Sequence, residues 1–115
     1  MQLLLYAAVA VVAVGGLSML FGARADVKGP QARQLVVDGA RLIDVRSPGE
    51  FQASHIAGAI NVPVEVLERR LKDVGPKDAV IVVYCASGAR SAHAKRVLVQ
   101  SGYATVHNLG PMGAW

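Results

Sequence analysis

The fold is decided by residues 79–91, AVIVVYCASGARS, where an apolar run meets a loop of small residues. Residues 79–84 are continuously apolar and mostly β-branched, which is typical of a strand covered on both faces. Residues 85–90 form the loop, and residues 91–101 place their apolar side chains at helical spacing. This stretch therefore predicts a buried strand that leads directly into a helix, with Cys85, the only cysteine of the chain, at the junction.

Shorter segments on both sides repeat this alternation of strand and helix. Strands that alternate with helices indicate an α/β protein, with a small parallel sheet flanked by helices. The sequence predicts further strands at 42–45, 60–62 and 105–109, further helices at 30–38 and 64–74, and a short helical turn around Phe51.

Length and composition limit the possible functions. The chain has 115 residues, enough for one compact domain, and a formal net charge of +4. This charge is small and dispersed, which argues against a nucleic-acid partner. A single cysteine excludes an internal disulfide framework and a zinc site built on several thiolates. The sequence implies no metal and no organic cofactor.

The N-terminal segment differs from the rest of the chain. Residues 3–21 carry no charge, and at about 1.5 Å per residue they would form a helix about 28 Å long, close to the thickness of a bilayer core. We therefore expect a single-pass transmembrane helix, or uncleaved signal anchor, over residues 1–23. Residues 24–29 are expected to form a linker, and residues 30–115 the folded domain.

The charges that flank this segment predict its orientation. Arg24, Lys28 and Arg33 follow it, whereas no Lys or Arg precedes it. The positive-inside rule then places the folded domain on the cytoplasmic side of the membrane. The alternative is export by a cleaved signal peptide, because Ala23, Arg24 and Ala25 fit an A-x-A cleavage pattern.

The loop after residue 84 has the features of an anion-binding site. In open parallel sheets, ligands bind beyond the carboxyl ends of the strands, where we expect both Cys85 and Asp44. The loop leads into a helix N-terminus, whose backbone N–H groups are unpaired. Such a nest holds an anion, which here would be a thiolate, a persulfide or a bound oxyanion. Small residues let these N–H groups converge, and they are Ala86, Ser87, Gly88 (suited to positive φ) and Ala89.

Cys85 and Arg90 are the candidate reactive and binding groups. A thiolate at a helix N-terminus has a pKa below the ordinary value, and Arg90 offers a guanidinium fork suited to sulfonate or phosphate oxygens. The alternatives are an inert core thiol and a surface arginine. The catalytic interpretation requires that Cys85 is ionised near neutral pH and open to solvent.

Two motifs resemble those of a known family. DVRSPGEFQASHIAGAINVP (44–63) and VVYCASGARSAHAKRVL (82–98) are similar to the two signatures of a single-domain rhodanese, a sulfurtransferase. The resemblance implies a rhodanese-like domain in which Cys85 takes a sulfane sulfur from a small anionic donor such as thiosulfate. The resulting persulfide would pass its outer sulfur to a thiol or protein acceptor. Arg90 would contact the sulfonate, and backbone N–H groups of residues 86–90 would surround the sulfur.

Four residues receive supporting roles. The resemblance implies that Asp44 and Arg46 form a pair near the floor of the site, and Asp44 is expected either to bind Arg46 or to cap the turn at Pro48. His55 is expected to be a hydrogen-bonded structural residue rather than a base, because a thiolate at a helix terminus needs no proton acceptor. Ser91 is expected to cap its helix rather than to contact substrate.

Two other functions fit part of the pattern. The first is a non-enzymatic persulfide carrier or redox-sensing module for a protein partner. The second is a phosphatase. The related cell-cycle phosphatases have a seven-residue loop from cysteine to arginine, whereas the loop from Cys85 to Arg90 has six residues, four of them between the two. The tail after the last strand also lacks a helix that the family often has, so Trp115 is a candidate to cover that face of the sheet.

Overall fold

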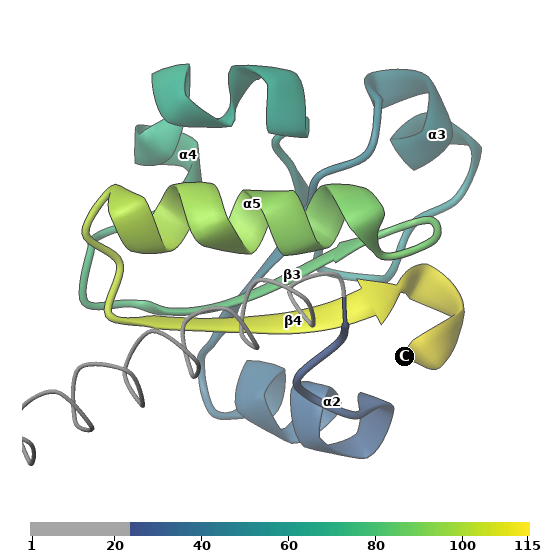
Figure 1. Ribbon diagram of the computed structural model, residues 1–115. Coiled ribbons are helices and arrows are strands. Elements are labelled where there is room, and N and C mark those ends of the chain that lie inside the picture. The colour runs from purple at the N-terminus through teal and green to yellow at the C-terminus, as the bar shows by residue number, and fades with distance from the viewer. Residues whose placement is uncertain (1–23) are drawn as a thin grey trace, which may run out of the picture.

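The computed structural model describes residues 24–115, which form a small α/β domain around one parallel sheet (Figure 1). The sheet has four strands in the order β2-β1-β3-β4, and every neighbouring pair is parallel. The predicted fold class is therefore confirmed for this domain. The strands are β1 (Arg41–Asp44), β2 (Ile60–Asn61), β3 (Val80–Cys85) and β4 (Thr105–Pro111).

Successive side chains of the central strand β3 point to opposite faces of the sheet, as in any strand. Ile81, Val83 and Cys85 belong to one buried cluster, and Val82 and Tyr84 belong to the cluster on the opposite face. Because both faces are covered, all five side chains are 0% exposed. This double burial explains why the strand is apolar throughout rather than at alternate positions.

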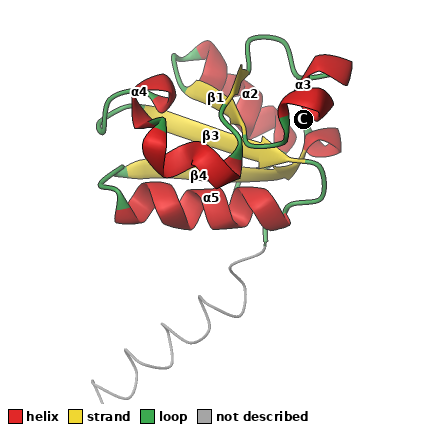
Figure 2. Ribbon diagram, turned by 90° about the horizontal axis from the view of Figure 1, so that it is seen from above, coloured by secondary structure: helices red, strands yellow, loops and turns green. Residues whose placement is uncertain are grey.

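Helices cover both faces of the sheet (Figures 1 and 2). The cluster that contains Cys85 packs under α5 (Ala89–Gln100), the 3-10 helix η1 (Val64–Arg69) and α4 (Leu71–Val74). On the opposite face lie α2 (Gly29–Val37) and the short turn η2 (Met112–Ala114). Trp115 packs against this second cluster, so it helps to cover the sheet face for which the sequence predicted no C-terminal helix.

The helix expected over residues 64–74 is broken into two pieces. Its first part is the 3-10 helix η1, and α4 begins only after Arg70. The backbone of Arg70 is not helical, with φ −124° and ψ 34°. Its side-chain Nε donates to the Asp73 carboxylate at 2.8 Å. Hydrophobic spacing alone predicts the buried face of such a segment but does not separate a continuous helix from two short ones.

The segment expected as a linker is packed onto the domain. The Asp26 backbone N–H donates to Asn108 O at 2.8 Å, and the Asp26 carboxylate accepts from the Asn108 backbone N–H at 2.8 Å. Val27 is 8% exposed within the apolar cluster under α2. Residues 26–29 of the predicted linker are therefore part of the packed domain, because Asp26 forms hydrogen bonds to β4 that a polar composition does not reveal.

The expected transmembrane segment, residues 1–23, lies outside the described residues. Within residues 24–115, no helix has the length and apolar character needed to cross a bilayer.

Candidate active site

Cys85 ends the central strand of the sheet, next to the helix α5. Only residues 86–88 separate β3 from α5, so the chain turns sharply at this point. Gly88 makes the turn possible, because its φ of 107° lies in the left-handed region that favours glycine, as expected. Cys85 is therefore the last residue of the strand rather than the first residue of the loop, and rigid elements fix its position on both sides.

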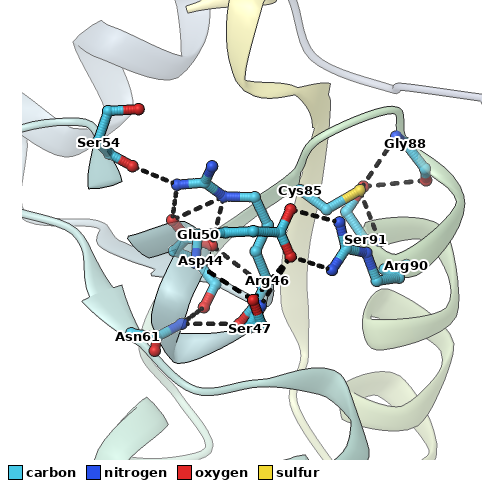
Figure 3. A network of polar contacts seen from close by, with 10 residues as sticks. All are labelled: Asp44, Arg46, Ser47, Glu50, Ser54, Asn61, Cys85, Gly88, Arg90 and Ser91. Atoms are coloured by element: carbon cyan, nitrogen blue, oxygen red, sulfur yellow. Dashed lines mark hydrogen bonds and ion pairs between the residues drawn. The ribbon is translucent and has the colours of Figure 1, made fainter. Parts of the chain in front are cut away.

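Several hydrogen bonds converge on the Cys85 sulfur (Figure 3). Backbone N–H groups donate to Sγ from Gly88 at 3.0 Å and from Ser91 at 3.3 Å. Ser91 Oγ lies 3.4 Å from Sγ and accepts from the thiol, while the hydroxyl hydrogen is donated to the carbonyl oxygen of Gly88 at 3.0 Å. The short turn and the first turn of α5 thus form an anion nest. Of the donors expected in residues 86–90, Gly88 takes part at hydrogen-bond distance, and the Ser91 backbone N–H, outside that range, is the second donor.

These contacts favour the ionised form of the thiol. Burial of Cys85 raises its pKa, but the hydrogen bond between its sulfur and the Ser91 side chain and the bonds from the backbone N–H groups of Ser91, Gly88 and Ser87 lower it by more. The pKa of the thiol therefore lies below its ordinary value. A thiolate is the nucleophilic form of cysteine, so this geometry prepares Cys85 for attack on an electrophilic atom.

The expectation that Cys85 is open to solvent is wrong for the structure described here. Cys85 is 0% exposed, because Gly88 and Ser91, both buried, close over its sulfur. The outer rim of the loop is accessible, since Ala86, Ser87 and Ala89 are exposed. The buried sulfur is therefore separated from solvent by residues of this loop.

Ser91 has a different position from the expected helix cap. The helix α5 begins at Ala89, and its N-cap is Gly88, which has no side chain for a capping bond. Ser91 is 0% exposed and lies in the first turn, with its hydroxyl directed at Sγ and at Gly88 O. The prediction of a cap is therefore wrong, because the left-handed Gly88 starts the helix earlier than the sequence suggested.

The role of Ser91 leads to a test. Replacing Ser91 with alanine removes the hydroxyl bond to Sγ, so the pKa of Cys85 is expected to rise and alkylation by iodoacetamide at neutral pH to slow by about tenfold. The measurement is the pH dependence of alkylation, whose midpoint should move upward. Ser87→Ala is the matched control, because Ser87 contributes its backbone N–H rather than its hydroxyl. A profile of Ser91→Ala that coincides with that of the control would contradict this role.

Arg90 does not stand free at the mouth of the loop. Its two terminal nitrogens donate to the two carboxylate oxygens of Glu50, at 2.7 and 3.0 Å (Figure 3). This bidentate pair raises the pKa of Arg90, chiefly through the hydrogen bonds to Glu50. The same bonds, with further bonds from Ser47, lower the pKa of Glu50 to about 2. Both side chains are therefore charged at neutral pH.

Sequence reasoning did not identify Glu50 as part of the site. Glu50 lies in α3 (Pro48–Ala53), which follows β1 at the carboxyl end of the sheet. The signal was present, because Ser47 and Glu50 form a capping box with Pro48 at the first helical position. A capping box fixes the helix start but does not reveal that Glu50 reaches across to Arg90, a residue 40 positions later in the chain.

The expected Asp44–Arg46 pair lies in the floor of this region. Arg46 donates to both carboxylate oxygens of Asp44, with the shortest bond at 2.7 Å, and also to Ser54 O at 2.7 Å. Asp44 is 0% exposed and Arg46 is 5% exposed. The Tyr84 hydroxyl accepts from the Ile56 backbone N–H at 3.2 Å, and burial raises its pKa to about 12. Asp44 thus binds Arg46, whereas Ser47 caps the turn at Pro48.

His55 and the question of a metal site remain to be compared with the structure. His55 stacks on Phe51, with ring centroids 3.7 Å apart, and its Nδ1 lies 2.8 Å from Phe51 O. These are the local contacts of a structural residue, and they do not involve Cys85. Across residues 24–115, no group of three or more His, Cys, Asp or Glu side chains is arranged to bind a metal ion.

Comparisons with known proteins support one family. A sequence model described as the rhodanese-like domain matches residues 25–115. Thiosulfate sulfurtransferase PspE of Escherichia coli (strain K12) is 45% identical over 69 residues, which are 59% of this chain and 66% of PspE. A sulfurtransferase of Allochromatium vinosum is 41% identical over 75 residues, which are 64% of this chain and 69% of that protein.

Solved structures agree with the sequence relatives. The human single-domain sulfurtransferase TSTD1 superposes with a TM-score of 0.69 at 31% identity, over 80% of this chain and 92% of that chain. A rhodanese with anions from E. coli gives a TM-score of 0.62 at 38% identity, over 67% and 92% of the two chains. The chain belongs to the rhodanese-like domain family.

Proposed function

We propose that the protein is a rhodanese-type sulfurtransferase that transfers a sulfane sulfur through a persulfide on Cys85. The donor is thiosulfate or a similar sulfur anion, and the acceptor is a thiol or a protein. The observation that carries this proposal is the convergence of backbone N–H groups and the Ser91 hydroxyl on Cys85 Sγ. The names of the relatives, thiosulfate sulfurtransferase and sulfurtransferase, support the same chemistry.

The first half-reaction forms the persulfide. The Cys85 thiolate attacks the outer sulfur of thiosulfate, a new S–S bond forms, and the bond between the two sulfurs of thiosulfate breaks. Sulfite leaves with the electron pair of that bond, so no external oxidant or reductant is needed. The negative charge that resided on Sγ is then carried by the outer sulfur, and N–H groups of the loop are available to stabilise it there.

The second half-reaction returns the enzyme to its starting state. A nucleophile such as cyanide or a thiolate attacks the outer sulfur of the persulfide, and the Cys85 thiolate is the leaving group. A leaving thiolate of low pKa departs more easily, so the same hydrogen bonds assist both halves of the cycle. Each half-reaction is a displacement at sulfur and requires no proton transfer to or from Cys85.

Turnover separates an enzyme from a persulfide carrier. With thiosulfate and cyanide in excess, an enzyme produces many thiocyanate molecules per chain at a constant rate. A carrier that serves one protein partner would take up one sulfur and then stop. The expected result is steady-state formation of thiocyanate, and a single stoichiometric release would favour the carrier instead.

We also propose, from the sequence of residues 1–23, that the chain is held at a membrane with its domain on the cytoplasmic side. The support is the uncharged stretch at 3–21 and the basic residues that follow it. Full-length chain expressed in bacteria should stay in the membrane fraction after carbonate extraction and resist protease added to intact spheroplasts. Recovery of a shortened chain that begins after Ala25 would show export by signal-peptide cleavage instead.

A further inference from the structure

The Glu50–Arg90 ion pair lies next to the nucleophile and changes the charge that a donor meets. Arg90 follows Cys85 by five positions, and the Cys85 thiolate is one of the charges that raise its pKa. Both terminal nitrogens of Arg90 are bonded to Glu50, so the guanidinium fork is already filled by a carboxylate. A sulfonate group can also present two oxygens to a guanidinium fork, so it competes with that carboxylate for Arg90.

The carboxylate is the more firmly held member of this pair. Glu50 Oε1 also accepts from the Ser47 hydroxyl at 3.0 Å and from the Ser47 backbone N–H at 3.2 Å. The Ser47 hydroxyl in return accepts from the Glu50 backbone N–H at 3.2 Å, which completes the capping box of α3. Within residues 24–115, the Arg90 side chain has hydrogen bonds to Glu50 alone, and the two side chains are about equally exposed, so the bonds from Ser47 are what hold Glu50 more firmly than Arg90.

The surrounding charges add to this effect. Glu65, at the start of η1, is a second carboxylate whose charge acts on Arg90, although it makes no hydrogen bond to it. Around the thiolate, one arginine is thus balanced by Glu50 and further opposed by Glu65. A donor with two negative charges meets side chains without net positive charge, and its contact with both terminal nitrogens of Arg90 requires that the ion pair opens.

We propose that Glu50 determines donor specificity at this site: by occupying Arg90, it disfavours dianionic donors such as thiosulfate relative to sulfur donors of lower charge. The donor part of this inference rests on the proposed function. The electrostatic part does not, because any reagent that reacts with Cys85 meets the same charges. Glu50 does not touch the reacting atoms and acts through Arg90.

Two alkylating reagents test the electrostatic part without any sulfur chemistry. Iodoacetate is an anion, iodoacetamide is neutral, and Cys85 is the only thiol in the chain. Glu50→Gln keeps the capping box, since glutamine also serves at that position. In this variant, the ratio of the iodoacetate to the iodoacetamide rate constant should rise by about fivefold, because Arg90 becomes available to the anion. The rate with iodoacetamide reports any accompanying change in the ionisation of Cys85, and the ratio of the two rates cancels it.

Two further variants control for net charge and for the role of Arg90. Glu65→Gln removes the same charge nearby without a hydrogen bond to Arg90, and it should change the ratio by less than about twofold. Glu50→Gln combined with Arg90→Gln should lose the gain completely. An equal gain in Glu65→Gln, or a gain that survives the loss of Arg90, would overturn the inference.

The enzymatic arm compares donors of different charge. For Glu50→Gln, KM for thiosulfate, a dianion, should fall by about fivefold with kcat unchanged, and KM for benzenethiosulfonate, a monoanion, should fall less. A loss of kcat with both donors and a slower reaction with iodoacetamide would show that Glu50 only positions the loop, which contradicts the proposal. If no donor loads Cys85 at all, the proposed function fails, and the alkylation ratios still decide the role of Glu50.

Discussion

Replacing Cys85 with alanine is expected to lower sulfur transfer by more than about a thousandfold. Both half-reactions make or break a bond at Sγ, and Cys85 is the only cysteine in the sequence, so no other thiol can take its place. The measurement is thiocyanate formation from thiosulfate and cyanide, with kcat/KM compared to that of the unmodified chain. Turnover close to that of the unmodified chain would contradict the proposed mechanism.

The loss of activity in this variant should not result from unfolding. Alanine removes one buried sulfur atom and leaves the Gly88 and Ser91 N–H groups without their acceptor, which costs about 1–3 kcal/mol of the free energy of unfolding. A domain typically has about 5–15 kcal/mol, so the variant is expected to fold. Cys85→Ser is the companion variant, since its hydroxyl can still accept these bonds. Both variants should show the circular dichroism spectrum of the unmodified protein.

Replacing Asp44 with alanine is expected to have the largest effect on stability. It leaves the Arg46 guanidinium, which is 5% exposed, without its carboxylate partner in the interior of the domain. Breaking a buried ion pair on one side costs about 3–5 kcal/mol, because the remaining charge stays desolvated. The measurement is the free energy of unfolding from denaturant titration. A variant already unfolded in the absence of denaturant would agree with the upper end of this range.

Asp73→Ala is the matched control for this prediction. Asp73 forms an ion pair with Arg70 of nearly the same length, 2.8 Å, but both side chains are at least 42% exposed. Such surface pairs contribute about 0–1 kcal/mol. The two variants thus remove the same chemical group from two ion pairs that differ in burial. A loss for Asp44→Ala no larger than that for Asp73→Ala would show that the Asp44–Arg46 pair is not a structural support.

The order of strands and helices and the position of the reactive cysteine could be predicted from local patterns. The apolar run before Cys85 requires burial on both faces, and the small residues after it allow a tight turn, so these features follow from the residues themselves. Gly88 indeed has a positive φ. The packing of Asp26 on β4 was missed because it depends on a hydrogen bond between residues 82 positions apart. The break at Arg70 was missed because hydrophobic spacing does not distinguish one helix from two short ones.

The charge state of the site could be predicted only in part. A loop with one arginine suggested a free cation for an anionic donor. Glu50, which is distant in sequence, instead accepts hydrogen bonds from both terminal nitrogens of that arginine. The same limit explains the error about Ser91, whose place inside the first helical turn depends on where the helix starts. It also explains the burial of Cys85, because the cover over the sulfur is formed by the folded loop.

The most direct test of sulfur transfer through Cys85 is the intact mass of the protein after exposure to thiosulfate near neutral pH. The chain should gain the mass of one sulfur atom, located on the peptide that contains Cys85, with one sulfite released per chain. Addition of cyanide should remove this sulfur and yield one thiocyanate. An unchanged mass, or a sulfur atom that is still gained by Cys85→Ala, would contradict the account.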